Sequence, residues 1–277
     1  MNKKVIVVII GALLLFAAIF LVVKVASLVL APKEAPVTSE IDKASGEKLL
    51  ETAQKFIADG ELLKAKNAYV RIMEKFPNSV DAQKVQEALD DINIKILFSP
   101  IITKDSLAYE VQQGDSLTKI AKKFNTTIEL IAKTNNLKDS SLRIGKKLKI
   151  SKAKFSILVD KSQNILTLRS DKDILKTYRI AIGKNNSTPV GNFKIVTRIV
   201  DPPWYPSTGG VIPSGDLKNV LGTRWLGLSK PSYGIHGTTQ PDSIGKSVTE
   251  GCVRLKNPDV EELYTIVPEG TEVIITD

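Results

Sequence analysis

The sequence contains a single cysteine and a single histidine among its 277 residues. One cysteine excludes any disulfide within the chain, and because it is Cys252 it also excludes a lipid-modified cysteine near the N-terminus. A zinc site is disfavoured, since zinc takes three or four protein ligands and only carboxylates would complete a set with Cys252 and His236. We therefore expect neither a metal nor another cofactor.

The cysteine and the histidine lie 16 positions apart in the chain. An ordinary thiol has a pKa of about 8.5 and is mostly protonated at neutral pH, so a cysteine nucleophile needs a neighbouring base. Gly237, Pro241 and Gly245 between the two predict a loop that folds back on itself. The pattern favours a nucleophile with its base, and a small buried cysteine beside a satisfied histidine remains the alternative.

The flanking residues resemble the signature of the L,D-transpeptidase (YkuD) family, in which His-Gly precedes Ser/Thr-x-Gly-Cys-x-Arg. The matching residues are His236, Gly237, Thr249, Gly251, Cys252 and Arg254. Residues 182–193 and 221–229 also resemble the stretches that lead to this segment in the family. Alternating apolar residues within 155–168 predict strands in their own right. We expect a mostly-β catalytic domain over residues 154–277.

The resemblance implies how the pair would act. Cys252 would attack a peptide carbonyl, and His236 would take its proton and later return one to the leaving amine. A backbone carbonyl beside the His-Gly pair would hold the imidazole tautomer, and Gly237 is the candidate.

Three further matched residues are expected to support the nucleophile. Gly251 lets the backbone turn sharply, and its N–H and that of Cys252 are the expected oxyanion hole. Arg254 would anchor a substrate carboxylate or favour the thiolate, and a structural salt bridge is the competing explanation. Thr249 would hydrogen-bond within the loop and orient it.

Residues 5–23 form a long apolar run near the N-terminus. As a helix they would extend about 28 Å, close to the hydrocarbon thickness of a bilayer. Lys3 and Lys4 predict a cytoplasmic N-terminus, and hence a single-pass membrane-anchored protein with an extracytoplasmic catalytic domain. A cleaved signal peptide is the alternative. A free thiol in an exported protein favours a reactive cysteine.

Between the anchor and the catalytic domain the sequence divides into further parts. Residues 1–31 would hold the anchor, and residues 32–45 lack apolar periodicity and are expected to form a linker. Residues 46–98 show helical spacing and resemble a tetratricopeptide repeat, with room for about one and a half repeats. A spacer and a docking surface for a protein partner both remain open for this all-α segment.

Residues 109–151 resemble a LysM module, with strand, helix, helix and strand in that order. Ser116 is expected to cap the first helix, and Thr126 with Glu129 to form a capping box on the second. The resemblance implies a groove for N-acetylglucosamine-containing glycans, lined by Gly114, Asp115, Ser116, Asn135, Asn136, Leu137 and Ile144. Ile144 departs from the proline that is common at its position.

Positive charge is concentrated in this module. Residues 104–154 hold twelve Lys or Arg against five Asp or Glu, which gives +7 of the net charge of +9. A basic module suits an anionic cell envelope. Nucleic acid would explain the charge equally well, but the chain lacks a nucleic-acid-binding motif, so we do not expect that partner.

The patterns together predict a membrane-tethered enzyme that crosslinks peptidoglycan stem peptides through a thioester on Cys252. With water as acceptor the same site would be an L,D-carboxypeptidase, and with a protein amine it would be a protein-to-peptidoglycan ligase. A catalytically inactive wall-binding scaffold and a papain-like protease are the other classes. The order of His236 before Cys252 argues against the protease.

Overall fold

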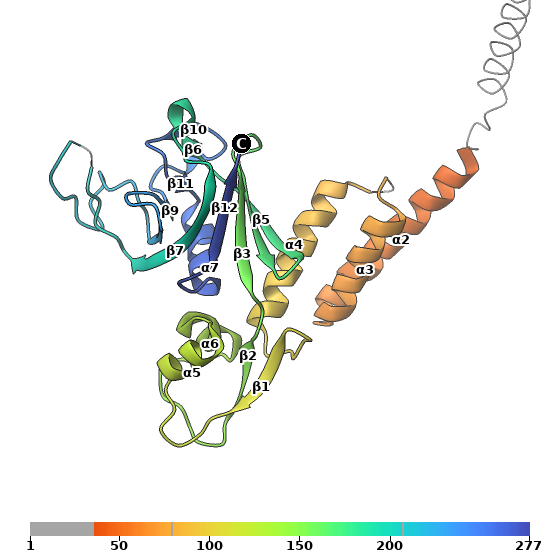
Figure 1. Ribbon diagram of the computed structural model, residues 1–277. Helices are drawn as coiled ribbons and strands as arrows, with labels where there is room; N and C mark the ends of the chain where they lie inside the picture. Colours follow the sequence, from red (N-terminus) through yellow and green to blue (C-terminus); the bar gives the residue numbers. More distant parts are fainter. Residues whose placement is uncertain (1–35, 79, 207) are drawn as a thin grey trace, which may run out of the picture.

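The structure is a computed structural model that describes residues 36–78, 80–206 and 208–277. Within these ranges, three helices come first, then a small two-stranded unit with two short helices, then a large sheet with one helix against it (Figure 1). The first part contains α2 (Pro36–Ala58), α3 (Leu62–Lys75) and α4 (Ala82–Phe98).

The helical segment folds around its own apolar stripe. The buried residues of α3 recur at the spacing of one helix face, and they are Ala65, Ala68, Tyr69 and Ile72. They pack with Ala53 of α2 and with Val85, Ile92 and Ile96 of α4. The all-α character expected for residues 46–98 is confirmed.

The expected linker over residues 32–45 is wrong from residue 36 onward, because α2 begins at Pro36 and includes residues 36–45. Proline is well suited to the first turn of a helix, where its missing N–H would have no partner. Residues 36–45 lack an apolar stripe, but they are helical because the helix that was expected from residue 46 already begins at Pro36.

The predicted membrane-anchored localisation needs correction. Within residues 36–78, 80–206 and 208–277, no helix is both long enough and apolar enough to cross a bilayer. The longest of the described helices, α2, has 23 residues, but its sequence contains charged residues such as Glu47, Lys48 and Glu51. Residues 5–23, on which the prediction rested, lie outside the described part of the chain.

The second part has the expected order of strand, helix, helix and strand. It consists of β1 (Ser106–Glu110), α5 (Leu117–Phe124), α6 (Ile128–Thr134) and β2 (Lys147–Ser151), with the two strands antiparallel. Ser116 caps α5 as predicted, since its side chain accepts from the Lys119 N–H at 3.2 Å.

The predicted capping box on α6 is wrong. Thr127, one residue later than expected, is the cap and accepts from the Leu130 N–H at 2.9 Å. The Glu129 carboxylate does not close a capping box but pairs with Arg198 of the large sheet at 3.2 Å. The Thr126 hydroxyl is buried without a hydrogen-bond partner in the described chain.

The third part is mostly β, as predicted. Its eight-stranded sheet has the order β11-β9-β8-β7-β12-β3-β4-β5. The strands are β3 (Phe155–Asp160), β4 (Ile165–Ser170), β5 (Asp173–Arg179), β7 (Gly191–Val200), β8 (Arg224–Leu228), β9 (Gly234–His236), β11 (Val253–Arg254) and β12 (Glu272–Thr276). Helix α7 (Asn257–Ile266) packs against β8 and β9. A short parallel pair, β6 (Ile182–Gly183) with β10 (Ser247–Thr249), lies outside this sheet.

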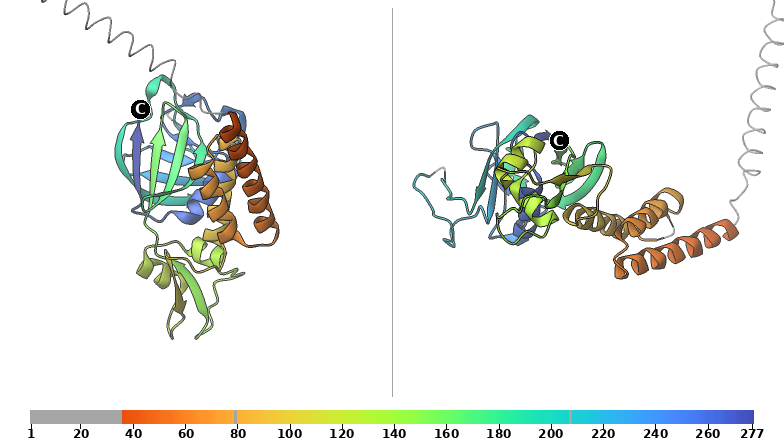
Figure 2. Two further views of the ribbon diagram at one scale, coloured as in Figure 1. Left: turned by 90° about the vertical axis from the view of Figure 1, so that its right-hand side faces the viewer. Right: turned by 90° about the horizontal axis from the view of Figure 1, so that it is seen from below.

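The three parts pack against one another. The core of the large sheet includes Ile94 from α4 and Leu130 from α6. Figure 2 shows the helical segment standing beside the sheet, and α4 contacts β5 directly. At that contact the buried Asp90 accepts from the Thr177 N–H at 2.9 Å. The helical segment is therefore docked on the sheet along α4.

A buried lysine joins the helical segment to the two-stranded unit. Lys149 of β2 is 5% exposed and donates to the carbonyls of Ile96 and Ser99, each at 2.9 Å. These carbonyls end α4, where a cation complements the helix dipole. Burial lowers the pKa of Lys149 to about 8.

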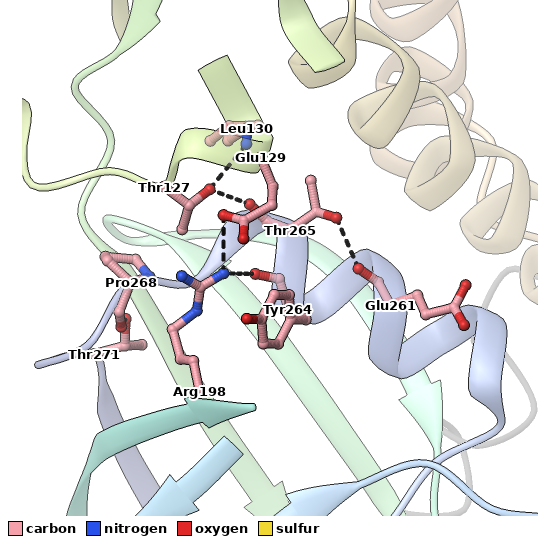
Figure 3. Close-up of polar contacts among 9 residues, drawn as sticks. All are labelled: Thr127, Glu129, Leu130, Arg198, Glu261, Tyr264, Thr265, Pro268 and Thr271. Atoms are coloured by element: carbon pink, nitrogen blue, oxygen red, sulfur yellow. Dashed lines mark hydrogen bonds and ion pairs between the residues drawn. The ribbon is translucent and has the colours of Figure 1, made fainter. Parts of the chain in front are cut away.

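A second joint links α6 to α7 (Figure 3). Arg198 of β7 donates to Glu129 of α6 and, at 2.7 Å, to the carbonyl of Tyr264 on α7. Its guanidinium also lies 4.1 Å from the centre of the Tyr264 ring. The Thr127 hydroxyl donates to the Thr265 carbonyl. The C-terminal half of α7 is thus held by the two-stranded unit.

Candidate active site

The fold places His236 at the end of β9 and Cys252 just before the neighbouring strand, β11. β9 and β11 are parallel, and Arg254 is opposite His236 in their register. Cys252 directly precedes β11. Directly opposed residues of paired strands share a face. His236 and Arg254 therefore lie on one face of the sheet, and the charge of Arg254 acts on both His236 and Cys252.

His236 is buried and firmly held. Its side chain is 2% exposed, and its Nδ1 lies 2.6 Å from the Gly237 carbonyl oxygen. Its ring stacks on Trp225 with ring centres 5.9 Å apart. The Gly237 carbonyl is the partner that the family resemblance implied for the imidazole, and because a carbonyl only accepts, it fixes the neutral ring with its proton on Nδ1.

The surroundings of His236 keep it neutral at physiological pH. Burial, and secondarily the charge of Arg254, lower its pKa to about 4. Hydrogen bonds to Gly237 and Leu221 act in the opposite direction. A backbone group raises the pKa of a histidine when it accepts a hydrogen bond from the ring, so the Leu221 group that acts here is its carbonyl. The two carbonyls would stabilise an imidazolium once it forms.

Cys252 is partly buried, and its Sγ lies 3.7 Å from the Ser232 carbonyl oxygen. Burial raises the pKa of the thiol above its ordinary value, although the Gly234 N–H and Arg254 lower it. The predicted effect of Arg254 thus has the expected direction but is outweighed by desolvation. At neutral pH the thiol is therefore protonated and the imidazole is neutral.

Thr249 organises the turn before the nucleophile. Its hydroxyl accepts from the Gly251 N–H at 3.2 Å and donates to the Cys252 carbonyl at 2.7 Å. Gly251 has φ +131°, and a Cβ there would lie 2.7 Å from the Tyr233 ring. The Gly251 N–H already donates to Thr249, so of the two expected oxyanion-hole donors only the Cys252 N–H remains a candidate.

Arg254 is 6% exposed and lies among neutral partners. Its Nη1 donates to Ser243 Oγ at 3.1 Å and to Gln240 Oε1 at 3.3 Å. Its Nε is buried and has no hydrogen-bond partner in the described ranges. A buried guanidinium with neutral neighbours is a site that an anion would complete.

Sequence reasoning did not single out four residues that build this site: Leu221, Trp225, Ser232 and Gly234. Gly234 is needed because a Cβ there would lie 2.5 Å from the Trp225 ring. Leu221 and Trp225 fall within residues 221–229, a block already noted for its resemblance. Their roles are backbone contacts and stacking, which a motif of side chains does not reveal.

The predicted glycan-binding residues divide into two sets. Asn136, Leu137 and Ile144 line a cavity of about 530 Å³, together with Lys138, Asp139, Ser141, Arg143 and Lys146. The other predicted residues, Gly114, Asp115, Ser116 and Asn135, are not among those that line it. Asn135 faces inward and bonds the backbone of Lys149, and Asp115 accepts from Tyr109 and Gln112. Among the described residues no cluster of three or more His, Cys, Asp or Glu is arranged to hold a metal ion.

Comparison with known proteins agrees with the geometry. Residues 154–275 match the L,D-transpeptidase catalytic domain (YkuD), and residues 109–151 match the LysM domain. The Bacillus subtilis (strain 168) protein YkuD, named as a candidate L,D-transpeptidase, is 39% identical over 176 residues, which cover 61% of this chain and 98% of that protein. YcfS of Escherichia coli (strain K12), named as a probable L,D-transpeptidase, is 29% identical over 193 residues, covering 58% and 59% of the two chains.

A solved L,D-transpeptidase from Mycobacterium smegmatis aligns with a TM-score of 0.40 and 17% identity, over 49% of this chain and 65% of that one. The full-length match to the Bacillus subtilis relative, with the catalytic and LysM matches, shows that the chain belongs to the YkuD family of L,D-transpeptidases.

Proposed function

We propose that the protein is a peptidoglycan L,D-transpeptidase that works through an acyl-enzyme on Cys252. The observation that supports the proposal is that Cys252 directly precedes β11, the strand paired with the strand of His236, and that Nδ1 of the imidazole lies 2.6 Å from the Gly237 carbonyl oxygen. That arrangement turns the unprotonated Nε2 into the available base.

The donor step follows from the neutral resting pair. Cys252 Sγ bonds to the carbonyl carbon of the third residue of a tetrapeptide stem while its proton moves to His236. The C–N bond to the terminal D-alanine then breaks, and His236 returns the proton to the departing amine. Since the resting thiol is protonated, proton transfer accompanies the attack. A thioester remains on Cys252.

The acceptor step uses the same groups in reverse. An amine from a neighbouring stem loses a proton to His236 and attacks the thioester carbonyl, and the proton returns to the departing sulfur. The thioester retains much of the free energy of the broken peptide bond, so no ATP is needed. Water as acceptor gives an L,D-carboxypeptidase, and a protein amine gives a ligase.

Two neighbouring groups are assigned supporting roles. The Cys252 N–H would donate to the oxyanion that forms in each step. Arg254 would bind a carboxylate of the stem peptide, because its guanidinium is buried and its Nη1 contacts only neutral side chains. These neutral contacts favour substrate binding over a structural salt bridge.

The other parts would position the enzyme on its substrate. The cavity with Asn136, Leu137 and Ile144 would hold a glycan strand, and its lysines suit an anionic polymer. For the helical segment, the tetratricopeptide-like repeat stays a prediction from the sequence, and we propose that the segment binds a protein partner. Its α4 face is occupied by β5, so a protein partner would use the remaining surface of α2 and α3.

The catalytic proposal is tested with the full-length chain, defined tetrapeptide muropeptides and mass spectrometry of the products. We expect a crosslinked dimer with loss of D-alanine, and a thioester mass on the only cysteine when the reaction is quenched in acid. Cys252→Ala should abolish both signals. A crosslinked product from Cys252→Ala would overturn the proposal, and hydrolysed tripeptide alone would assign the carboxypeptidase instead.

The glycan proposal is tested by sedimentation with purified sacculi. Ile144→Glu places a charge in the cavity at a residue that is 69% exposed, so folding should be unaffected. We expect weaker pelleting. Ile102→Glu, 51% exposed and outside the cavity, is the matched control. Equal pelleting of both variants would contradict the glycan assignment.

A further inference from the structure

Asn257 occupies a junction beside the base. It is the first residue of α7, and two residues separate it from the end of β11. Its Oδ1 accepts from the Thr238 N–H at 2.9 Å and from the Thr223 N–H at 3.3 Å. One amide oxygen thus joins the turn that enters β8 to the turn that leaves β9. Only an oxygen serves there, because both partners are donors.

These two turns carry the two carbonyls that face His236. Gly237, whose carbonyl accepts from Nδ1, directly precedes Thr238. Leu221, whose backbone raises the pKa of the imidazole, lies two residues before Thr223. The spacing between the turns therefore sets the spacing between the two carbonyls around the ring.

The close approach of Asn257 explains two glycines. A Cβ on Gly237 or on Gly222 would lie 2.2 Å from Asn257 Oδ1. Gly222 also adopts φ +66°, which favours glycine. Both turns are thus shaped to receive this one side chain, which is more than a generic helix start requires.

The connection continues to the buried cation. Thr238, 3% exposed, accepts from the Gln240 N–H at 2.9 Å through its hydroxyl. The side chain of Gln240 in turn accepts from Arg254. A displacement of Thr238 would therefore shift both Gly237, which holds His236, and Gln240, which contacts Arg254.

We propose that Asn257 is a positioning residue for the base: its amide oxygen ties the two turns together so that the carbonyls of Leu221 and Gly237 hold the imidazole of His236. The role rests on the proposed function, in which His236 moves the proton of Cys252. A misplacement of about 1 Å in such a group costs about 10²-fold in rate.

The test uses the only histidine of the chain as its own probe. In the full-length protein with ¹⁵N-labelled histidine, NMR reports the tautomer and titration of His236 alone. The wild type should show one tautomer, protonated on Nδ1, with a midpoint near 4. Asn257→Ala should show mixed tautomers, a midpoint shifted towards 6.5, and crosslinking slower by about 10²-fold. Asn192→Ala, an exposed asparagine on β7, should match the wild type.

The outcomes separate the two proposals. A wild-type tautomer and titration in Asn257→Ala would overturn the positioning role, whether or not the enzyme turns over. Absence of crosslinking by the wild type would reject the proposed function and leave the NMR comparison valid. If Asn257→Ala does not fold, Asn257→Asp decides, since a carboxylate oxygen accepts from the same two N–H groups. It should keep the Nδ1 tautomer, and mixed tautomers in that folded variant would also overturn the role.

Discussion

The burial of His236 makes the stability of the protein depend on pH. In the unfolded chain the imidazole has a pKa near 6.5, whereas burial lowers it to about 4 in the fold. Between these values the unfolded state binds a proton that the folded state does not. The free energy of unfolding should therefore fall as pH decreases from 6.5 towards 4, by up to about 3 kcal/mol from this group.

Urea unfolding between pH 4 and 7.5, compared for the wild type and His236→Gln, checks this expectation. The glutamine variant cannot titrate, so the difference in unfolding free energy between the two proteins should change across this window. Above pH 6.5 the difference should be constant. If the unfolding free energies of the two proteins changed in parallel over the whole pH range, the pKa of His236 would be the same in the folded and the unfolded chain.

Thr249 carries both polar contacts of the turn before the nucleophile. Thr249→Val keeps the shape of the side chain but leaves the Gly251 N–H and the Cys252 carbonyl without this partner. The unfolding free energy should fall by about 1–3 kcal/mol, the cost of unsatisfied buried groups. Crosslinking should also slow because the Cys252 backbone is released. Thr249→Ser retains the hydroxyl and should behave like the wild type in denaturant unfolding and in the muropeptide assay.

At the level of elements, Lys149 of β2 caps the C-terminal end of α4 by donating to its last carbonyls. Lys149→Met removes the donor from the carbonyls of Ile96 and Ser99, so the last turn of α4 should open more often. Hydrogen exchange should show faster labelling there, with the unfolding free energy lower by about 1–3 kcal/mol. Lys147→Met, on an exposed position of the same strand, is the control. Equal exchange in the two variants would contradict this role.

The sequence predicted elements well where a local pattern decides them. Apolar alternation marked β3 and β4, and the cap at Ser116 follows from one hydroxyl before a helical stripe. The start of α6 was missed because Glu129, which fits a capping box, is drawn to Arg198 some 70 residues away. Such long-range pairs override local signals and are not visible in the motif.

The candidate site divides in the same way. Cys252 and His236 were predicted from their residue types, and the Gly237 carbonyl from the resemblance. The contributions of Leu221 and Trp225 depend on where β8 passes relative to β9, which only the sheet order fixes. The raised pKa of Cys252 likewise depends on burial, and motif spacing carries no information about that.

For the molecule as a whole, the shared core predicts that the parts unfold together. Leu130 of α6 is 1% exposed and packs in the core of the large sheet. Leu130→Ala should lower the unfolding free energy by about 2–5 kcal/mol through the cavity it leaves. Calorimetry should still show one transition, at a lower temperature. Ile144→Ala, on an exposed residue of the same module, should not shift it. A second transition at the wild-type temperature would mean independent units.

Helix α7 fixes the length of the chain between two joints. Asn257 meets the turns around His236 at one end, and Tyr264 and Thr265 meet Arg198 and Thr127 near the other, about 12 Å further along the axis. Inserting or deleting one residue between them would rotate one end against the other by about 100°. Related proteins that keep both joints should therefore vary in loop length elsewhere but tolerate no gap in this helix.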